Sequence, residues 1–364
     1  MSDWFADLID QPQVLLLLGM ALIGIAYGLI AQWSRFCLLR GLLHRWQHQD
    51  SRKLQAFALA MATSLLFTQL ARVLFDLDLD RSVFFPRDFS PLLVLLGGVL
   101  FGYGMTLANA CGARSVVLLA SGNLRSAVTL LALALGAGMT LSGILAPLRL
   151  LLDGLPLPRL SGVTLPELFG LSSSWAMLVL ISLLLLVLLA FCFLSCPRCR
   201  TSGRRLALDG RDALGGLSLG LLIALSWWWT GWAAQDPFQP QAPAALSFIA
   251  PIAQTQQYLL LSTGSRLNLG VVLVLGVFCG ALVRALLAKE FRWQGFDSTR
   301  QTHFSLLGGF MMGVGGVLAL GCSVGQGLSG FSTLALTSFF ALAGILLGTR
   351  WAMRRHLSSS HPSS

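Results

Sequence analysis

The chain carries little charge for its length, and its long apolar stretches contain no carboxylate. Only 11% of its 364 residues are charged, whereas 55% are hydrophobic, and the mean hydropathy is +0.75. A soluble domain carries about 25% charged residues, so an ordinary soluble protein is excluded. Aspartate and glutamate inside membrane helices mark ion pathways and proton relays. Their absence argues against a metal-cation carrier and leaves anions or neutral solutes.

Lysine is also scarce, although the net charge is +10. Lys53 and Lys289 are the two lysines, and the arginines sit mainly in short polar connections rather than in one patch. This distribution is typical of cytoplasmic loops and indicates no nucleic-acid partner. The N-terminus, Met1-Ser2-Asp3, has no basic segment, and no small-residue cleavage site follows the first apolar run. We expect that run to be a retained helix rather than a signal peptide.

Nine apolar stretches are long enough to cross a bilayer, for which about 20 residues are needed. They cover roughly 14–33, 54–75, 91–110, 126–147, 175–195, 213–232, 267–288, 304–321 and 333–350. We therefore expect an all-α, polytopic membrane protein of about nine transmembrane helices, with one transporter domain over 1–355 and a disordered tail over 356–364. Two shorter apolar pieces, near 113–122 and 323–331, are expected to be short re-entrant helices buried in protein.

Four basic clusters follow the first, fifth, seventh and ninth stretches, on one side of the bilayer if nine spans exist. The opposite side receives the segment 76–90, which contains four aspartates, and 233–257, which has no lysine or arginine. Positively charged loops stay in the cytoplasm. We therefore place the N-terminus outside and the C-terminus in the cytoplasm.

A glycine pattern occurs twice and is followed each time by a cysteine. Residues 96–104 read LGGVLFGYG and precede Cys111, and residues 307–315 read LGGFMMGVG and precede Cys322, at a constant offset of 211 residues. The copies extend over about 54–147 and 267–350. Their central helices cross the bilayer in opposite directions, so the repeat is inverted, as in many transporters. Glycine-based helix packing explains the glycines but not the matching cysteine.

The short segments after the two cysteines contain groups that suit an anion. Helix N-termini carry free N–H groups and partial positive charge, and a thiol adds a soft, polarisable sulfur. The candidate substrate-binding residues are Cys37, Cys111, Cys322, Gly112, Arg114, Ser115, Ser323 and Gln326. For Cys37 the spacing alone leaves open a buried packing role.

The remaining cysteines carry weaker signals. Cys192, Cys196 and Cys199 have a spacing that could hold a metal or undergo redox cycling, but no fourth ligand is evident nearby. We expect them to form an inner interfacial cluster and Cys279 to serve packing. We expect no cofactor, no metal and no catalytic residue.

The cysteine motifs resemble those of the YeeE/YedE family of sulfur-transport membrane proteins. The resemblance rests on Arg35-Phe36-Cys37, Asn109-Ala110-Cys111-Gly112 and Leu320-Gly321-Cys322-Ser323-Val324-Gly325-Gln326-Gly327. It implies an hourglass-like transporter in the bacterial inner membrane that takes up thiosulfate, with three cysteines contacting the anion in succession. It also implies a small cytoplasmic sulfur carrier of the TusA type as partner.

Two other functions remain open at this point. One is a membrane thiol oxidoreductase, which needs neighbouring cysteine pairs and usually a quinone site. The other is a scaffold that recruits a sulfur carrier without transporting anything. The inverted repeat favours a transporter over the scaffold.

Overall fold

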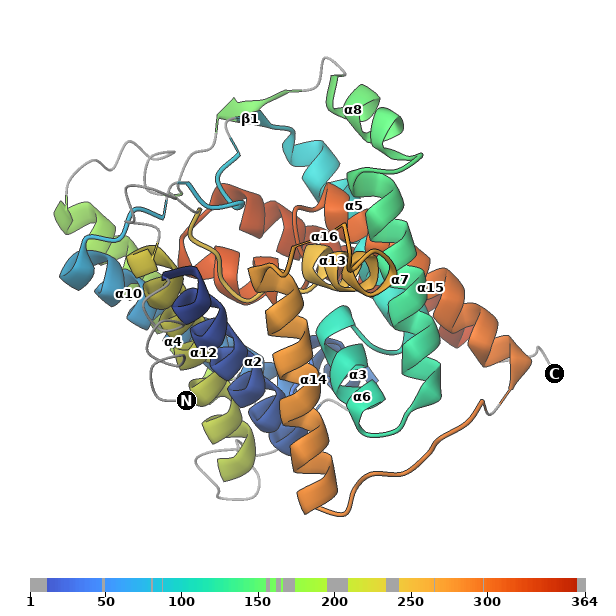
Figure 1. Cartoon of the computed structure of the whole chain (residues 1–364). Helices are drawn as coiled ribbons and strands as arrows, with labels where there is room; N and C mark the ends of the chain where they lie inside the picture. Colours follow the sequence, from blue (N-terminus) through green and yellow to red (C-terminus); the bar gives the residue numbers. More distant parts are fainter. Residues whose placement is uncertain are drawn as a thin grey trace, which may run out of the picture.

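The computed structural model is built almost wholly of helices. It describes residues 12–47, 50–79, 81–86, 88–154, 158–161, 165, 174–194, 209–233, 242–264, 266–296 and 298–358. The helices are α2 (Pro12–Ser34), α3 (Leu38–Gln47), α4 (Arg52–Phe75), α5 (Pro91–Ala108), α6 (Gly112–Ala120), α7 (Leu124–Leu141), α8 (Ala146–Gly154), α10 (Ser174–Leu194), α12 (Gly210–Ala233), α13 (Ile249–Leu260), α14 (Leu269–Leu287), α15 (Thr299–Leu318), the π-helix η1 (Gly325–Gly330) and α16 (Leu336–Ser358). Two short strands, β1 (Asp88–Phe89) and β2 (Leu160–Ser161), pair antiparallel at the upper end of the molecule (Figure 1).

The expected all-α class is confirmed, and each apolar stretch predicted from the sequence coincides with a helix. Within the described residues, seven helical segments are long and apolar enough to cross a membrane. Of the other two, α10 contributes the shorter apolar segment Val179–Cys192, and α15 begins with polar residues. The count of nine spans therefore stays a prediction. Helix α16 runs on to Ser358, into the tail predicted to be disordered, and the rest of that tail lies outside the described residues.

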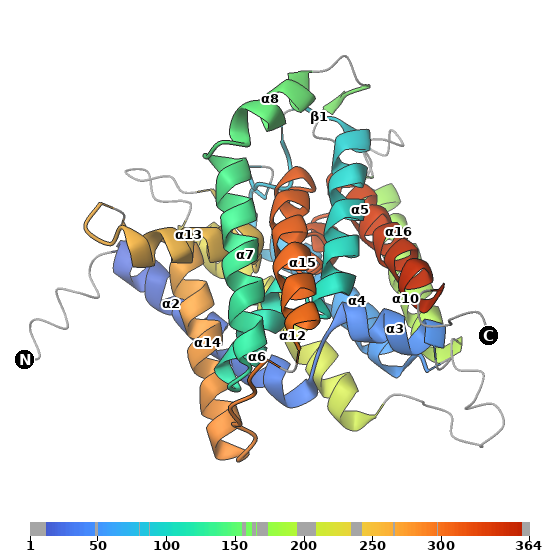
Figure 2. The same ribbon diagram turned by 90° about the vertical axis from the view of Figure 1, so that its right-hand side faces the viewer.

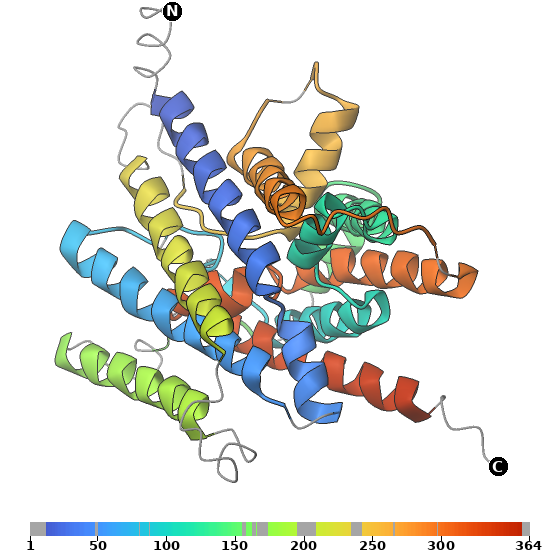
Figure 3. The ribbon, with the colours of Figure 1, turned by 90° about the horizontal axis from the view of Figure 1, so that it is seen from below.

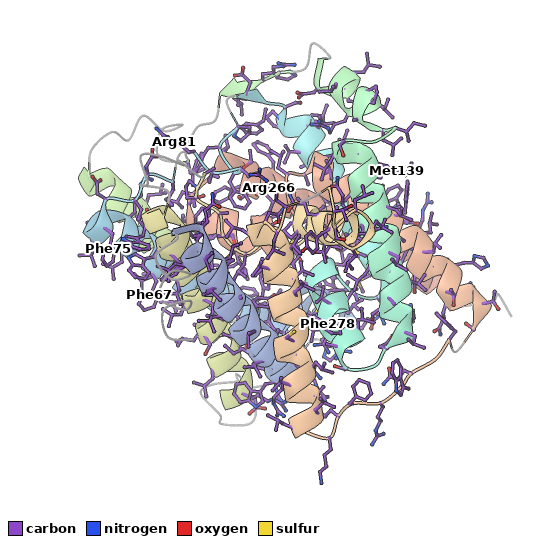
Figure 4. The ribbon with its side chains drawn as sticks, in the orientation of Figure 1. Phe67, Phe75, Arg81, Met139, Arg266 and Phe278 are labelled. Carbon is purple, nitrogen blue, oxygen red and sulfur yellow. The ribbon has the colours of Figure 1, made fainter. Side chains whose placement is uncertain are left out.

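Large apolar side chains cover the outside of the helices. Val73 and Leu287 are 78% and 76% exposed, and Phe67 and Phe75 lie on the outer side of α4 (Figure 4). A soluble monomer rarely exposes a contiguous apolar surface of this kind. The outer surface of the helices is therefore suited to lipid.

Helix α15 packs between α5 and α7 at the centre of the molecule (Figure 2), and α16 packs along the other side of α5. Helix α14 lies along α2, and α12 lies between α2 and α4 (Figure 3). The packing of α5 against α16 thus corresponds to that of α15 against α7. The packing of α4 against α12 corresponds in the same way to that of α14 against α2. The order of packing is the one expected if each half repeats the other.

The glycines of the repeated pattern make matched backbone contacts. A Cβ on Gly98 would lie 2.6 Å from the carbonyl oxygen of Ala341, and a Cβ on Gly309 would lie 2.5 Å from that of Thr129. A second matched set is Gly102 against Ile345 and Gly313 against Leu133. The absence of a side chain at these positions lets the helices approach at backbone distance, as small residues do in membrane interfaces.

Candidate functional site

The three cysteines of the motifs come together in the middle of the molecule. All three are free thiols with 5% exposure or less. The thiols of Cys37 and Cys111 lie within hydrogen-bonding reach of each other. Both line a small central cavity, which Ser323 lines as well. Its volume is about 10 Å³, which leaves room for about one water molecule. The centre is therefore a constriction in this conformation.

A left-handed residue precedes each cysteine by two positions. Arg35, Asn109 and Leu320 have φ values of 51°, 58° and 58°. A residue in this conformation ends a helix and turns the chain sharply. The next helix then begins just beyond the cysteine, which is why two short helices, α3 and α6, and the π-helix η1 start at the centre rather than at a membrane surface. Asparagine is common in such turns, so Asn109 is compatible with one, whereas Arg35 and Leu320 carry no signal for these turns.

Each thiol lies against the first turn of the segment that follows it. The Gly325 N–H donates to Cys322 Sγ over 3.3 Å. The Cys111 and Cys37 sulfurs likewise lie within reach of the backbone N–H groups of Arg114 and Arg40. Helix N-termini carry partial positive charge. The N-termini of α3 and α6 therefore surround the Cys37–Cys111 pair with positive potential.

Arg114 is a buried cation whose hydrogen-bonding capacity is largely unused. Its side chain is 7% exposed, and its Nε and Nη1 atoms have no hydrogen-bond partner among the described residues. The hydroxyl of the next residue, Ser115, is buried and also has no hydrogen-bond partner within the described ranges. An unpaired buried charge is costly and is kept where it has a use. The Arg114 guanidinium and the Ser115 hydroxyl are thus available as hydrogen-bond donors beside Cys37 and Cys111.

The other predicted site residues are placed differently. Gly112 packs against apolar groups, because a Cβ there would lie 3.2 Å from Leu133 Cδ1 and 3.3 Å from Ile252 Cδ1. The amide of Gln326 is engaged, since its Nε2 donates to the Ala319 carbonyl over 2.8 Å and its Oε1 accepts from Ser338 Oγ over 2.6 Å. Gln326 therefore holds η1 in place in this conformation.

Two larger cavities lie on either side of the constriction. The upper cavity, beside α13, has a volume of about 530 Å³ and is lined among others by Ser247, Gly321 and Arg266, which Figure 4 labels near the start of α14. The lower cavity, beside the start of α6, has a volume of about 490 Å³. Cys322 lies between the upper and central cavities, because Gly321 lines one and Ser323 the other. Arg114 lines both the central and the lower cavity.

The lower cavity is strongly basic. Its lining includes six cationic residues and one carboxylate, Glu290. The cations are Arg35, Arg40, Arg114, Arg125, Lys289 and Arg292. Glu290 accepts from Gln32 Nε2 over 3.3 Å and from Arg35 Nη2 over 3.5 Å. A cleft lined by charges of one sign concentrates counter-ions, so this cavity attracts anions.

Tyr27 is a central residue that sequence reasoning missed. It is 2% exposed on α2, and its ring packs 5.3 Å from that of Phe248. It also lies within electrostatic range of all three cysteines and of Arg114. A single tyrosine in an apolar run has the same pattern as ordinary packing, so the sequence carried no signal for it.

The other cysteines lie away from this centre. Cys192 donates to the Gln55 carbonyl over 3.5 Å, and Cys279 is exposed on α14. Cys196 and Cys199 lie outside the described residues.

Comparison with known proteins places this arrangement in a family. The sequence profile described as sulphur transport matches residues 33–351. A thiosulfate transporter TsuA from Escherichia coli is 25% identical over 338 residues, which cover 89% of this chain and 90% of that protein. A thiosulfate transporter TsuA from Spirochaeta thermophila is 26% identical over 360 residues, which cover 91% and 96%. The chain is a multi-pass membrane protein and belongs to the sulphur transport family.

Proposed function

We propose that this protein carries thiosulfate, or a closely related sulfur oxyanion, from outside the cell into the cytoplasm. The observation that carries the proposal is the gathering of three free thiols at the constriction between two cavities, beside the buried Arg114, whose Nε and Nη1 have no hydrogen-bond partner in the described part of the chain. The names of the two relatives support thiosulfate as the substrate.

The proposed path follows the cavities. The anion enters the upper cavity, contacts Cys322, then the Cys37–Cys111 pair, and leaves past Arg114 into the basic lower cavity. A thiol is a weak hydrogen-bond donor with a polarisable sulfur, so it binds a soft anion without holding it. Weak binding at successive sites lets an ion leave as well as enter. Passage requires no covalent intermediate, and we assign the chain transport rather than catalysis.

The proposed topology has nine spans, with the N-terminus outside and the C-terminus in the cytoplasm of a bacterial inner membrane. The matched glycine contacts of α5 with α16 and of α15 with α7 support an inverted repeat. With this orientation the basic lower cavity faces the cytoplasm. A small sulfur carrier of the TusA type is the proposed partner there, as the family resemblance implies.

Growth on thiosulfate as the sole sulfur source tests the proposal. A bacterial strain that lacks its own thiosulfate uptake is expected to grow when it expresses this chain, and to stop growing with Cys322→Ala or Cys111→Ala. Cys279→Ala is the matched control, because Cys279 is exposed on the outer surface of α14. Normal growth of both central variants would refute the path.

A thiol oxidoreductase is the second candidate, favoured by the contact between the Cys37 and Cys111 thiols. Mass spectrometry of the protein during thiosulfate uptake separates the two. A disulfide or persulfide that forms and disappears with turnover supports the oxidoreductase, whereas thiols that stay reduced support transport. Flux into liposomes that hold only the purified protein excludes a scaffold.

A further inference from the structure

The surroundings of Cys37 in the lower half have a counterpart in the upper half. Cys37 comes directly before α3, which connects α2 to α4 and packs against α4. Helix α13 connects α12 to α14 and packs against α14 in the same way. Because α2 packs along α14 as α12 packs along α4, α13 takes the place of α3 in the other half. The counterpart of Cys37 therefore lies just before α13.

Phe248 occupies that position, and Ser247 is the residue before it. Phe248 directly precedes α13 at Ile249 and follows Cys37 by 211 residues, the offset that also separates Cys111 from Cys322. The same offset of 211 relates Arg114 to Gly325. The set Cys37, Cys111 and Arg114 thus corresponds to Phe248, Cys322 and Gly325, and Ser247 is the polar residue next to this set.

The contacts around Gly325 bring the Ser247 side chain to this set. A Cβ on Gly325 would lie 2.9 Å from Ser247 Oγ and 3.7 Å from Cys322 Sγ, so the hydroxyl and the thiol flank one small space. The arginine side chain that fills the equivalent place in the lower half is missing here. Ser247 also lines the upper cavity and is half-buried. The Ser329 hydroxyl donates to the Leu246 carbonyl over 2.7 Å and fixes this segment against η1.

We propose that Ser247 is a fourth substrate contact, at which the sulfur oxyanion first binds before it reaches Cys322. This inference rests on the proposed function. A hydroxyl donates strong hydrogen bonds to oxygen, whereas a thiol suits a soft sulfur. The pair therefore recognises both ends of the ion. Ser247 donates a hydrogen bond to an oxygen, and Cys322 contacts the terminal sulfur. Sulfate offers only oxygen atoms, so it can bind Ser247 but has no terminal sulfur for Cys322 to contact.

Uptake kinetics in proteoliposomes test the contact. Ser247→Ala is expected to raise the KM for thiosulfate roughly 2- to 10-fold, the cost of one neutral hydrogen bond, and to leave the maximal rate within twofold. Ser247→Thr keeps the hydroxyl and is expected to restore the KM. The control is Ser182→Ala on α10, whose exposed hydroxyl donates to the Val179 carbonyl. An unchanged KM in Ser247→Ala, with wild-type uptake intact, would overturn this inference and leave the proposed function standing.

A labelling experiment tests the position independently of transport kinetics. Ser247→Cys is treated from outside intact cells with a membrane-impermeant methanethiosulfonate, and labelling above that of the wild-type chain is measured. We expect added labelling that millimolar thiosulfate slows and equimolar sulfate slows less. Labelling that thiosulfate does not slow, or that appears only in inverted membranes, would contradict the proposed contact. Absence of thiosulfate uptake by the wild-type protein would instead refute the proposed function.

Discussion

The thiols of Cys37 and Cys111 meet at the centre of the molecule, although they precede different helices, α3 and α6. Both are free and almost fully buried. The contact exists because left-handed residues, Arg35 and Asn109, turn the chain two positions before each cysteine. Two short helices thereby begin at the same point, with their positive ends on the path proposed for the anion.

Mild oxidation is expected to join Cys37 and Cys111 in a disulfide. Diamide would accept the two electrons and two protons, and uptake would stop because the bridge closes a cavity of about 10 Å³. Thiol titration before and after oxidation measures the loss of two thiols, and a reductant should restore both thiols and uptake. The uptake that Cys37→Ser retains should resist diamide. Inhibition of that variant to the same extent would place the oxidation elsewhere.

Arg114→Met is expected to stabilise the protein and to abolish uptake. Methionine fills much of the same space, while the substitution removes a buried charge whose Nε and Nη1 have no partner among the residues that the structure describes. Replacing a buried ion by a well-packed apolar side chain is often stabilising, by about 1–4 kcal/mol in known cases. Thermal unfolding in detergent and uptake in liposomes are the two measurements. A lower melting temperature would show that Arg114 is a structural residue.

Alanine at matched glycines is expected to damage both halves alike. In Gly102→Ala and Gly313→Ala, the new methyl group would collide with the carbonyl oxygen of Ile345 or Leu133. Overpacking of this kind costs typically 1–3 kcal/mol, and we expect a similar loss in each variant. Gly138→Ala on α7 is the control, because no described atom outside its own turn of helix lies within 4 Å of its Cβ position. Unequal losses would argue against an equivalence of the two halves.

Tyr27→Phe is expected to slow uptake without loss of stability. The phenyl ring keeps the contact with Phe248, whose ring lies 5.3 Å away, and only the hydroxyl near the cysteines is removed. Uptake rate and melting temperature, measured on the same preparation, check this. A normal uptake rate would make Tyr27 a packing residue.

The helices could be predicted from the sequence, because the lengths of the apolar stretches indicate them. The offset of the two motifs could also be predicted, because the glycine spacing repeats. The meeting of Cys37 with Cys111 could not, since it depends on two left-handed turns. Asparagine favours such a turn at Asn109, but Arg35 gives no sign of one. Gln326 illustrates a second reason why the site could not be predicted in full from the sequence. Its residue type suits a substrate donor, but its amide is already engaged by the Ala319 carbonyl and the Ser338 hydroxyl, which are distant from it in the sequence pattern.

Thiosulfate flux into liposomes that contain only this protein tests the central claim most directly. The account predicts flux with the wild-type chain and with Cys279→Ala, a loss of at least tenfold (roughly 1.4 kcal/mol) with Cys322→Ala and Cys111→Ala, and little inhibition by sulfate. Equal flux through all four proteins, or no flux through the wild-type chain, would contradict it.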